Sequence, residues 1–75
     1  MNLKSEAKIR NLTDKQQQVY DQIVNLTETY PGILPTASQL AKIFNTSLQN
    51  INNILFKLEA KGFIKRERGI KILKK

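Results

Sequence analysis

Four uncharged amide side chains near the middle of the chain are the residues best suited to specific chemistry: Gln49, Asn50, Asn52 and Asn53. An amide both donates and accepts hydrogen bonds, which matches the N6 and N7 edge of adenine in the DNA major groove. Each asparagine in a helix costs about half a kcal/mol relative to alanine, so a purely structural helix would more usually carry Lys, Glu or Ala. We therefore interpret these residues as candidates for base reading. An ordinary polar helix face is the alternative.

Positive charge is concentrated in the last quarter of the chain. Five Lys/Arg against four Asp/Glu leave +1 over residues 1–56, and eight against two leave +6 over residues 57–75, of a total of +7. Such asymmetry suits a polyanion, either nucleic acid or an anionic membrane surface. A solvated basic face is the plain alternative. If the partner is DNA, the residues predicted to contact its backbone are Ser47, Lys57, Lys65, Arg66, Arg68 and Lys71.

The composition argues against several other classes of protein. The 75 residues include no cysteine and no histidine, so disulfides, thiolate metal sites and the commonest general base are absent. No nucleophile–base pair, metal cluster or phosphate loop can be assembled, so we expect neither an enzyme nor a cofactor. No apolar run exceeds three residues, and we expect no membrane span, no signal peptide and a cytoplasmic protein.

Two capping boxes and a serine predict the starts of three helices. Thr13–Gln16 opens a helix that should run to about Thr29 or Tyr30, where Pro31-Gly32 stops it. Thr36–Gln39 opens a helix over residues 37–44, with Leu40, Ile43 and Phe44 as its apolar face. Ser47, with Thr46 as a rival cap, opens a helix over residues 48–61 that carries the four amides. Its core face is predicted to be Ile51, Ile54, Leu55 and Leu58.

The second and third predicted helices have the spacing of a helix-turn-helix. A small residue, Ala41, lies where the helices must approach closely, and Asn45 lies in the turn, where it tolerates a left-handed backbone. Ile51 and Ile54 follow at the offsets that return apolar side chains to the first of these helices.

A basic hairpin is predicted to follow. Phe63, Ile64, Ile70 and Ile72 alternate in part with charged residues around Gly69, which is typical of a β-hairpin with one buried face. The segment Ile33-Leu34 is a candidate short strand that would pair with this hairpin. A helix-turn-helix closed by such a hairpin is a winged helix, so the predicted fold class is mainly α with a small β-hairpin.

Residues 12–75 are predicted to form this winged-helix domain, and residues 1–11 a basic arm or short extension, with a disordered tail as the alternative. Within the domain, the segments LTDKQQQVYDQI, LPTASQLAKIF and LFKLEAKGFI resemble the DNA-binding domain of the LexA repressor over about Leu12 to Leu73. The resemblance implies a winged helix that reads bases from the start of its third helix. On this chain those positions are the four amides already named. It also implies a bacterial, phage or mobile-element origin.

Three departures from the LexA pattern limit what the resemblance implies. The turn between the second and third helices is one residue shorter, and Asn52 and Asn53 replace acidic residues of the family, so the operator sequence does not transfer. The self-cleaving protease domain, which also dimerises LexA, is absent from the sequence.

The sequence thus predicts a small transcriptional regulator, with repression favoured, that binds double-stranded DNA sequence-specifically as a homodimer on an inverted repeat. One alternative is a protein-interaction adapter that modulates a repressor, polymerase or replication protein. Another is a replication or packaging initiator. A protein partner is compatible with all three, and no membrane partner is expected.

Overall fold

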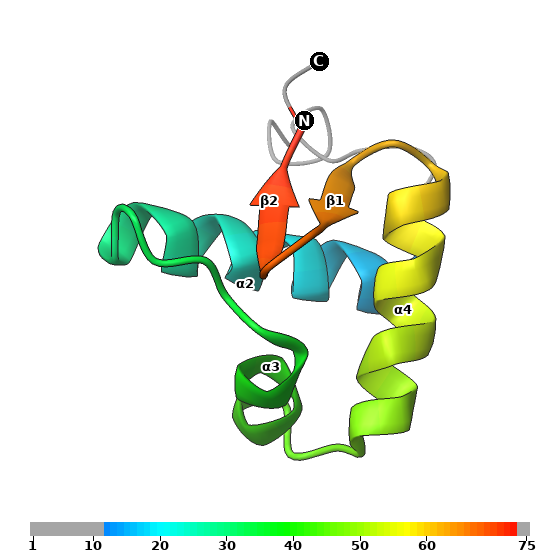
Figure 1. Ribbon diagram of the computed structural model, residues 1–75. Helices are drawn as coiled ribbons and strands as arrows, with labels where there is room; N and C mark the ends of the chain where they lie inside the picture. The colour runs from blue at the N-terminus through cyan, green and yellow to red at the C-terminus, as the bar shows by residue number, and fades with distance from the viewer. Residues whose placement is uncertain (1–11, 74–75) are drawn as a thin grey trace, which may run out of the picture.

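The computed structural model of the chain describes residues 12–73, which form three helices and a two-stranded hairpin. The order is α2 (Asp14–Thr29), α3 (Ala37–Ile43), α4 (Leu48–Ala60), β1 (Ile64–Arg66) and β2 (Ile70–Ile72) (Figure 1). This arrangement confirms the predicted fold class of a winged helix-turn-helix. The predicted arm, residues 1–11, lies outside the described residues.

The helices begin where their caps predict. The Thr13 hydroxyl accepts from the Gln16 amide at 3.2 Å, and the Gln16 side chain accepts from the Thr13 amide at 3.2 Å. Thr36 and Gln39 form the same reciprocal pair at the start of α3. Ser47, rather than the rival Thr46, caps α4 by accepting from the Asn50 amide at 3.0 Å. Both α3 and α4 end one residue earlier than predicted, because the last turn of a helix frays.

The turn between α3 and α4 is built around Asn45. Its backbone is left-handed, with φ of 54°, as the sequence predicts for a short polar residue. The next amide, Thr46 N–H, donates to the Ala41 carbonyl at 2.9 Å and closes the turn. This places the start of α4 directly after α3 at one end of the molecule (Figure 1).

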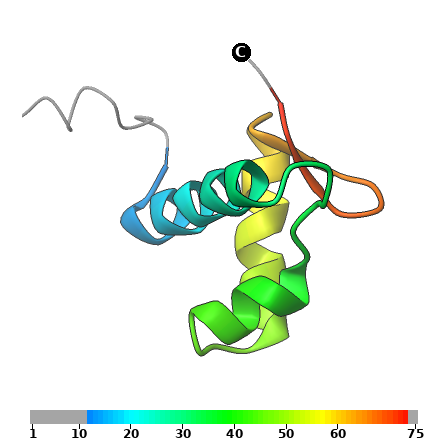
Figure 2. The same ribbon diagram turned by 90° about the vertical axis from the view of Figure 1, so that its left-hand side faces the viewer.

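The core lies between α4, α2 and the hairpin, with α3 covering one end. Figure 2 shows the hairpin extending beyond the helices on one side. The rings of Phe63 and Tyr20 pack edge to face, with ring centroids 5.8 Å apart. The buried apolar side chains are Val19, Ile23, Leu40, Ile51, Ile54, Leu55, Leu58, Phe63, Ile64 and Ile70.

Two sequence predictions about packing are wrong. Ile43 is 48% exposed, because the seven-residue α3 packs on the core through Leu40, with Ala41 and Phe44 partly buried beside it. The segment Ile33-Leu34 forms no strand. The hairpin instead attaches to this loop by one backbone bond, from the Ile70 amide to the Pro35 carbonyl at 2.9 Å.

Two glutamines are buried that the periodicity did not predict. Gln16 and Gln17 are each less than 10% exposed. Gln16 also accepts a hydrogen bond from Lys61 Nζ at 3.0 Å, and Gln17 donates to Asp21 at 2.9 Å. Partners within the fold satisfy polar atoms that burial would otherwise leave unpaired.

Candidate nucleic-acid interface

The exposed face of α4 follows from the way in which the helix is packed. Its predicted core residues, Ile51, Ile54, Leu55 and Leu58, are all buried, with α2 and the hairpin on that side (Figure 1). The opposite side of the helix is therefore open to solvent. At helical spacing, Gln49, Asn53, Phe56 and Ala60 follow one line along this side, and all four are exposed. We call this line of four residues the α4 stripe.

The structure separates the four predicted base-reading amides into two kinds. Gln49 and Asn53 lie on the α4 stripe, and neither side chain forms a hydrogen bond within residues 12–73. Asn50 is exposed, but its Nδ2 donates to the Thr46 hydroxyl at 2.9 Å, which orients its amide toward the turn. Asn52 is half-buried, and its Oδ1 is shielded from solvent with no hydrogen-bond partner within residues 12–73.

The start of α4 offers backbone N–H groups and a hydroxyl. Ser47 Oγ accepts from the Asn50 amide, and the hydroxyl proton of an exposed serine can still be donated to a phosphate. The positive end of the helix dipole at the same place favours an anion. Ser47 is exposed at this end of the helix, where an anion is favoured.

The cations of the wing, defined here as residues 63–73, are all exposed but do not share one direction. The register pairs Lys65 with Lys71 and Arg66 with Ile70. Because side chains alternate across a strand, Lys65 and Lys71 lie on the outer face, and Arg66 lies on the face that carries the buried isoleucines. Arg66 and Arg68 border a hollow of about 180 Å³ between the wing and the start of α3.

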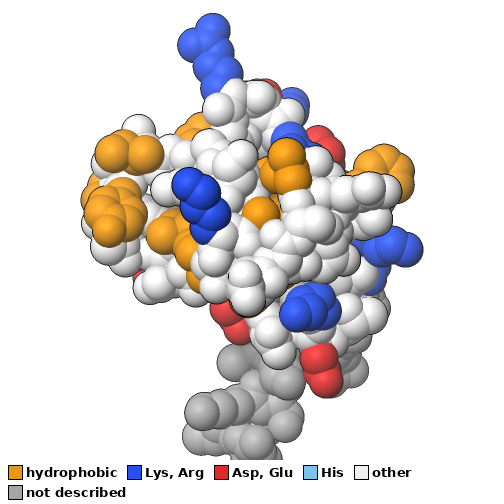
Figure 3. All heavy atoms as spheres, turned by 90° about the horizontal axis from the view of Figure 1, so that it is seen from below, with side chains coloured by type: hydrophobic (Ala, Val, Ile, Leu, Met, Phe, Trp, Pro, Cys, Tyr) orange, Lys and Arg blue, Asp and Glu red, His pale blue; other side chains and the backbone are white. Residues whose placement is uncertain are grey.

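The acidic residues near the wing contact the wing itself. Glu67 forms an ion pair with Lys65 at 3.3 Å, and the Glu59 carboxylate accepts from the Arg66 amide at 3.3 Å. Lys57 is exposed on α4. Figure 3 shows the end of the molecule that carries α3 and the start of α4. Most of it is uncharged, and separate Lys and Arg side chains are spread over it. Neutral polar groups are the kind that bond to base edges, and cations are the kind that bind phosphates.

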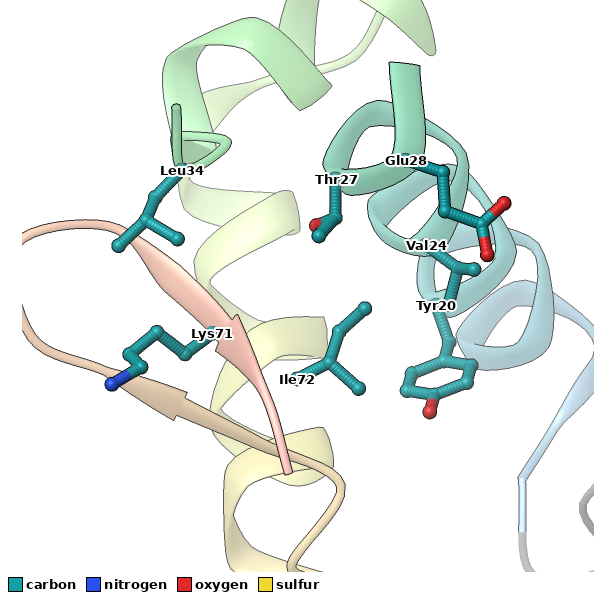
Figure 4. Close-up of a pocket in the computed structure, with 7 residues that line it drawn as sticks. All are labelled: Tyr20, Val24, Thr27, Glu28, Leu34, Lys71 and Ile72. Carbon is teal, nitrogen blue, oxygen red and sulfur yellow. The ribbon is translucent and has the colours of Figure 1, made fainter. Parts of the chain in front are cut away.

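A separate hollow of about 490 Å³ lies between α2 and β2. Leu34 and Ile72 line one side, and Tyr20, Val24 and Thr27 of α2 line the other (Figure 4). Glu28 and Lys71 are its charged lining residues, and residues 12–73 hold no cluster of three metal-ligating side chains. The lining is therefore largely apolar.

Sequence reasoning missed Phe56, an aromatic residue in the middle of the α4 stripe. Helical spacing could have found it, since Phe56 follows Asn53 by three positions and precedes Ala60 by four.

A helix-turn-helix with an exposed polar recognition helix and a basic wing defines the class of winged-helix DNA-binding domains. The sequence profile of the MarR family matches residues 26–69, more than half of the chain, and the chain belongs to the MarR family. This is a family of transcription regulators and not of enzymes. The match supports the winged helix-turn-helix part of the resemblance to LexA, but not a specific relation to LexA.

No curated protein and no solved structure matches the chain at a significant level. In the part of the chain that the structure describes, no helix is long and apolar enough to cross a membrane.

Proposed function

We propose that this MarR-family chain regulates transcription by inserting α4 into the major groove of a specific double-stranded DNA site. The observation that carries the proposal is the exposed, uncharged α4 stripe, on a chain whose α4 and wing also expose cations. Gln49 and Asn53 would read base edges, and Asn50 would contact the groove near the turn. Because Asn52 Oδ1 is shielded from solvent, we do not propose that Asn52 reads a base.

The backbone contacts belong to the same proposal. Ser47, Lys57 and the wing residues Lys65, Arg66, Arg68 and Lys71 would bind phosphates, which fix the position of the protein without reading sequence. Repression, by occupying a promoter, is the favoured outcome of binding. Repression and a bacterial, phage or mobile-element origin rest on the resemblance to LexA.

Selection of bound sequences from a random duplex pool tests the proposal. The chain should enrich one motif, and Gln49→Ala or Asn53→Ala should lower affinity for that motif by about 1–3 kcal/mol and affinity for random duplex much less. Arg66→Ala is the matched control, since loss of a phosphate contact should weaken both about equally. If Gln49→Ala and Asn53→Ala lower affinity for the motif and for random duplex equally, Gln49 and Asn53 do not read bases.

A protein-interaction adapter is the second candidate, favoured by one observation. Tyr30 and Ile33, which flank Pro31-Gly32 after α2, are 53% and 63% exposed, and Figure 3 shows hydrophobic side chains gathered on that side. Such a patch can mark a protein contact. Absence of a mobility shift on any duplex at low salt would favour the adapter over DNA binding.

A further inference from the structure

Phe56 is the most exposed large hydrophobic side chain of the described residues, with 68% of its surface accessible. An aromatic residue loses side-chain freedom in a helix, and an exposed helix position is better filled by Ala, Lys or Glu. A single exposed apolar residue is ordinary. The position of this one, on the same line as two predicted base readers, is what calls for an explanation.

Gln49 and Phe56 lie seven positions apart on the α4 stripe. Seven residues at 1.5 Å each place Phe56 about 10 Å further along the helix than Gln49, or about three base-pair steps of 3.4 Å. A helix lying along the groove that brings Gln49 and Asn53 to base edges would therefore bring Phe56 to another base pair.

The surroundings of Phe56 also suit a base contact. The α4 stripe holds no charged residue. The nearby carboxylate of Glu59 accepts from the Arg66 backbone, which directs it toward the wing. Lys57, the next residue, is exposed beside the stripe and free to reach a phosphate at the groove edge.

The major groove offers one apolar feature among the four standard bases, the C5 methyl group of thymine, and apolar side chains including Phe recognise it. We infer that Phe56 is a specificity-determining residue that packs on a thymine methyl group, about three base pairs from the base that Gln49 reads. This inference rests on the proposed function and adds a preferred base to it.

Deoxyuridine tests the inference because it lacks the methyl group and keeps every hydrogen-bonding atom of thymine. In the motif enriched by the wild-type chain, each thymine is replaced singly by deoxyuridine, and affinities are measured for wild type and Phe56→Ala. At one thymine the replacement should weaken wild-type binding about fourfold, the value of one buried methyl group. Phe56→Ala should bind the thymine duplex no more tightly than the wild type binds the deoxyuridine duplex. Replacing that thymine by deoxyuridine should not weaken binding of Phe56→Ala further.

Ile33→Ala is the matched control, since it removes a comparably exposed apolar side chain away from α4 and should keep the wild-type response to deoxyuridine. Circular dichroism and thermal unfolding should show that Phe56→Ala folds, because the side chain is not part of the core. If no thymine shows a loss in wild type that Phe56→Ala abolishes, the inference is wrong.

The experiments distinguish failure of this inference from failure of the proposed function. A motif that depends on Gln49 but shows no coupling between Phe56 and any thymine methyl overturns this inference and keeps the proposed function. A chain that enriches no motif, or binds all duplexes equally, overturns both.

Discussion

The four amide side chains of α4 share the same functional group but differ in how accessible they are to a partner. Gln49, Asn50, Asn52 and Asn53 look equivalent in the sequence, and the chemistry of an amide could be predicted for all of them. Which amides are open to a partner depends on the rotation of α4 against the core and on the neighbouring turn. Those depend on contacts between residues far apart in the chain, which local spacing does not encode.

Asn52 provides the first prediction. Its Oδ1 is shielded from solvent without a hydrogen-bond partner among the described residues, and an unpaired buried polar atom costs about 1–3 kcal/mol. Asn52→Ala removes that atom and improves helix propensity, so the free energy of unfolding should rise by about 0.5–1 kcal/mol, while affinity for the selected DNA motif stays unchanged. Urea unfolding and mobility shifts measure the two effects. If Asn52→Ala instead loses as much affinity as is expected for Gln49→Ala, Asn52 does read a base.

The elements show where sequence reasoning succeeds and where it ends. Helix starts were predicted correctly because a cap is decided by residues three positions apart, as Thr13 with Gln16 shows. The exposure of Ile43 and the absence of a strand at Ile33-Leu34 were missed. Both depend on how α3 and the loop dock against distant elements, so periodicity within either segment could not decide them.

The attachment of the wing provides the second prediction. A Cβ at Gly69 would lie 2.5 Å from Leu34 Cβ and 3.2 Å from the Pro35 carbonyl oxygen, so the loop before α3 would have to move. Gly69→Ala should therefore lower the free energy of unfolding by about 1–3 kcal/mol, the usual cost of overpacking. Arg68→Ala, at the exposed neighbouring position, should change it by less than about 0.5 kcal/mol. Equal stability of the two variants, measured by thermal unfolding, would mean that the loop is not held close to Gly69.

At the scale of the whole molecule, charge separates into a nearly neutral part and a basic part. The +6 over residues 57–75 belongs to the end of α4, the wing and the C-terminal residues. The two carboxylates of that stretch, Glu59 and Glu67, contact wing residues. Glu67 partly neutralises Lys65, and Lys57, Arg66, Arg68 and Lys71 are the other exposed cations that can bind a polyanion.

The third prediction concerns salt. If the basic part makes about four to six phosphate contacts, the logarithm of affinity should fall with the logarithm of salt concentration at a slope of about −4 to −5. Arg66→Ala should reduce the magnitude of this slope by about one, and Gln49→Ala should leave it unchanged. Fluorescence anisotropy on a labelled duplex between 50 and 200 mM salt, about the range over which the effect is large, measures it. A slope near zero would contradict a phosphate-binding role for these cations.

The last prediction concerns the number of copies on DNA. One α4 reaches a few base pairs, and each contributes about 1–3 kcal/mol of discrimination, which the many competing sites of a genome can offset. Two copies on an inverted repeat would double the readable sequence, and half-sites one helical turn apart, about 34–36 Å, would place both helices on one side of the duplex.

We expect duplexes with two half-sites to bind two copies with positive cooperativity. Changing the spacing by about half a turn should abolish the cooperativity and leave single-site affinity intact. We propose that residues 1–11 together with the exposed side of α2 form the contact between copies, so deleting residues 1–10 should also abolish cooperativity while thermal unfolding stays the same. Sedimentation of the complexes counts the copies, and independent binding to both half-sites at every spacing would contradict pairing on DNA.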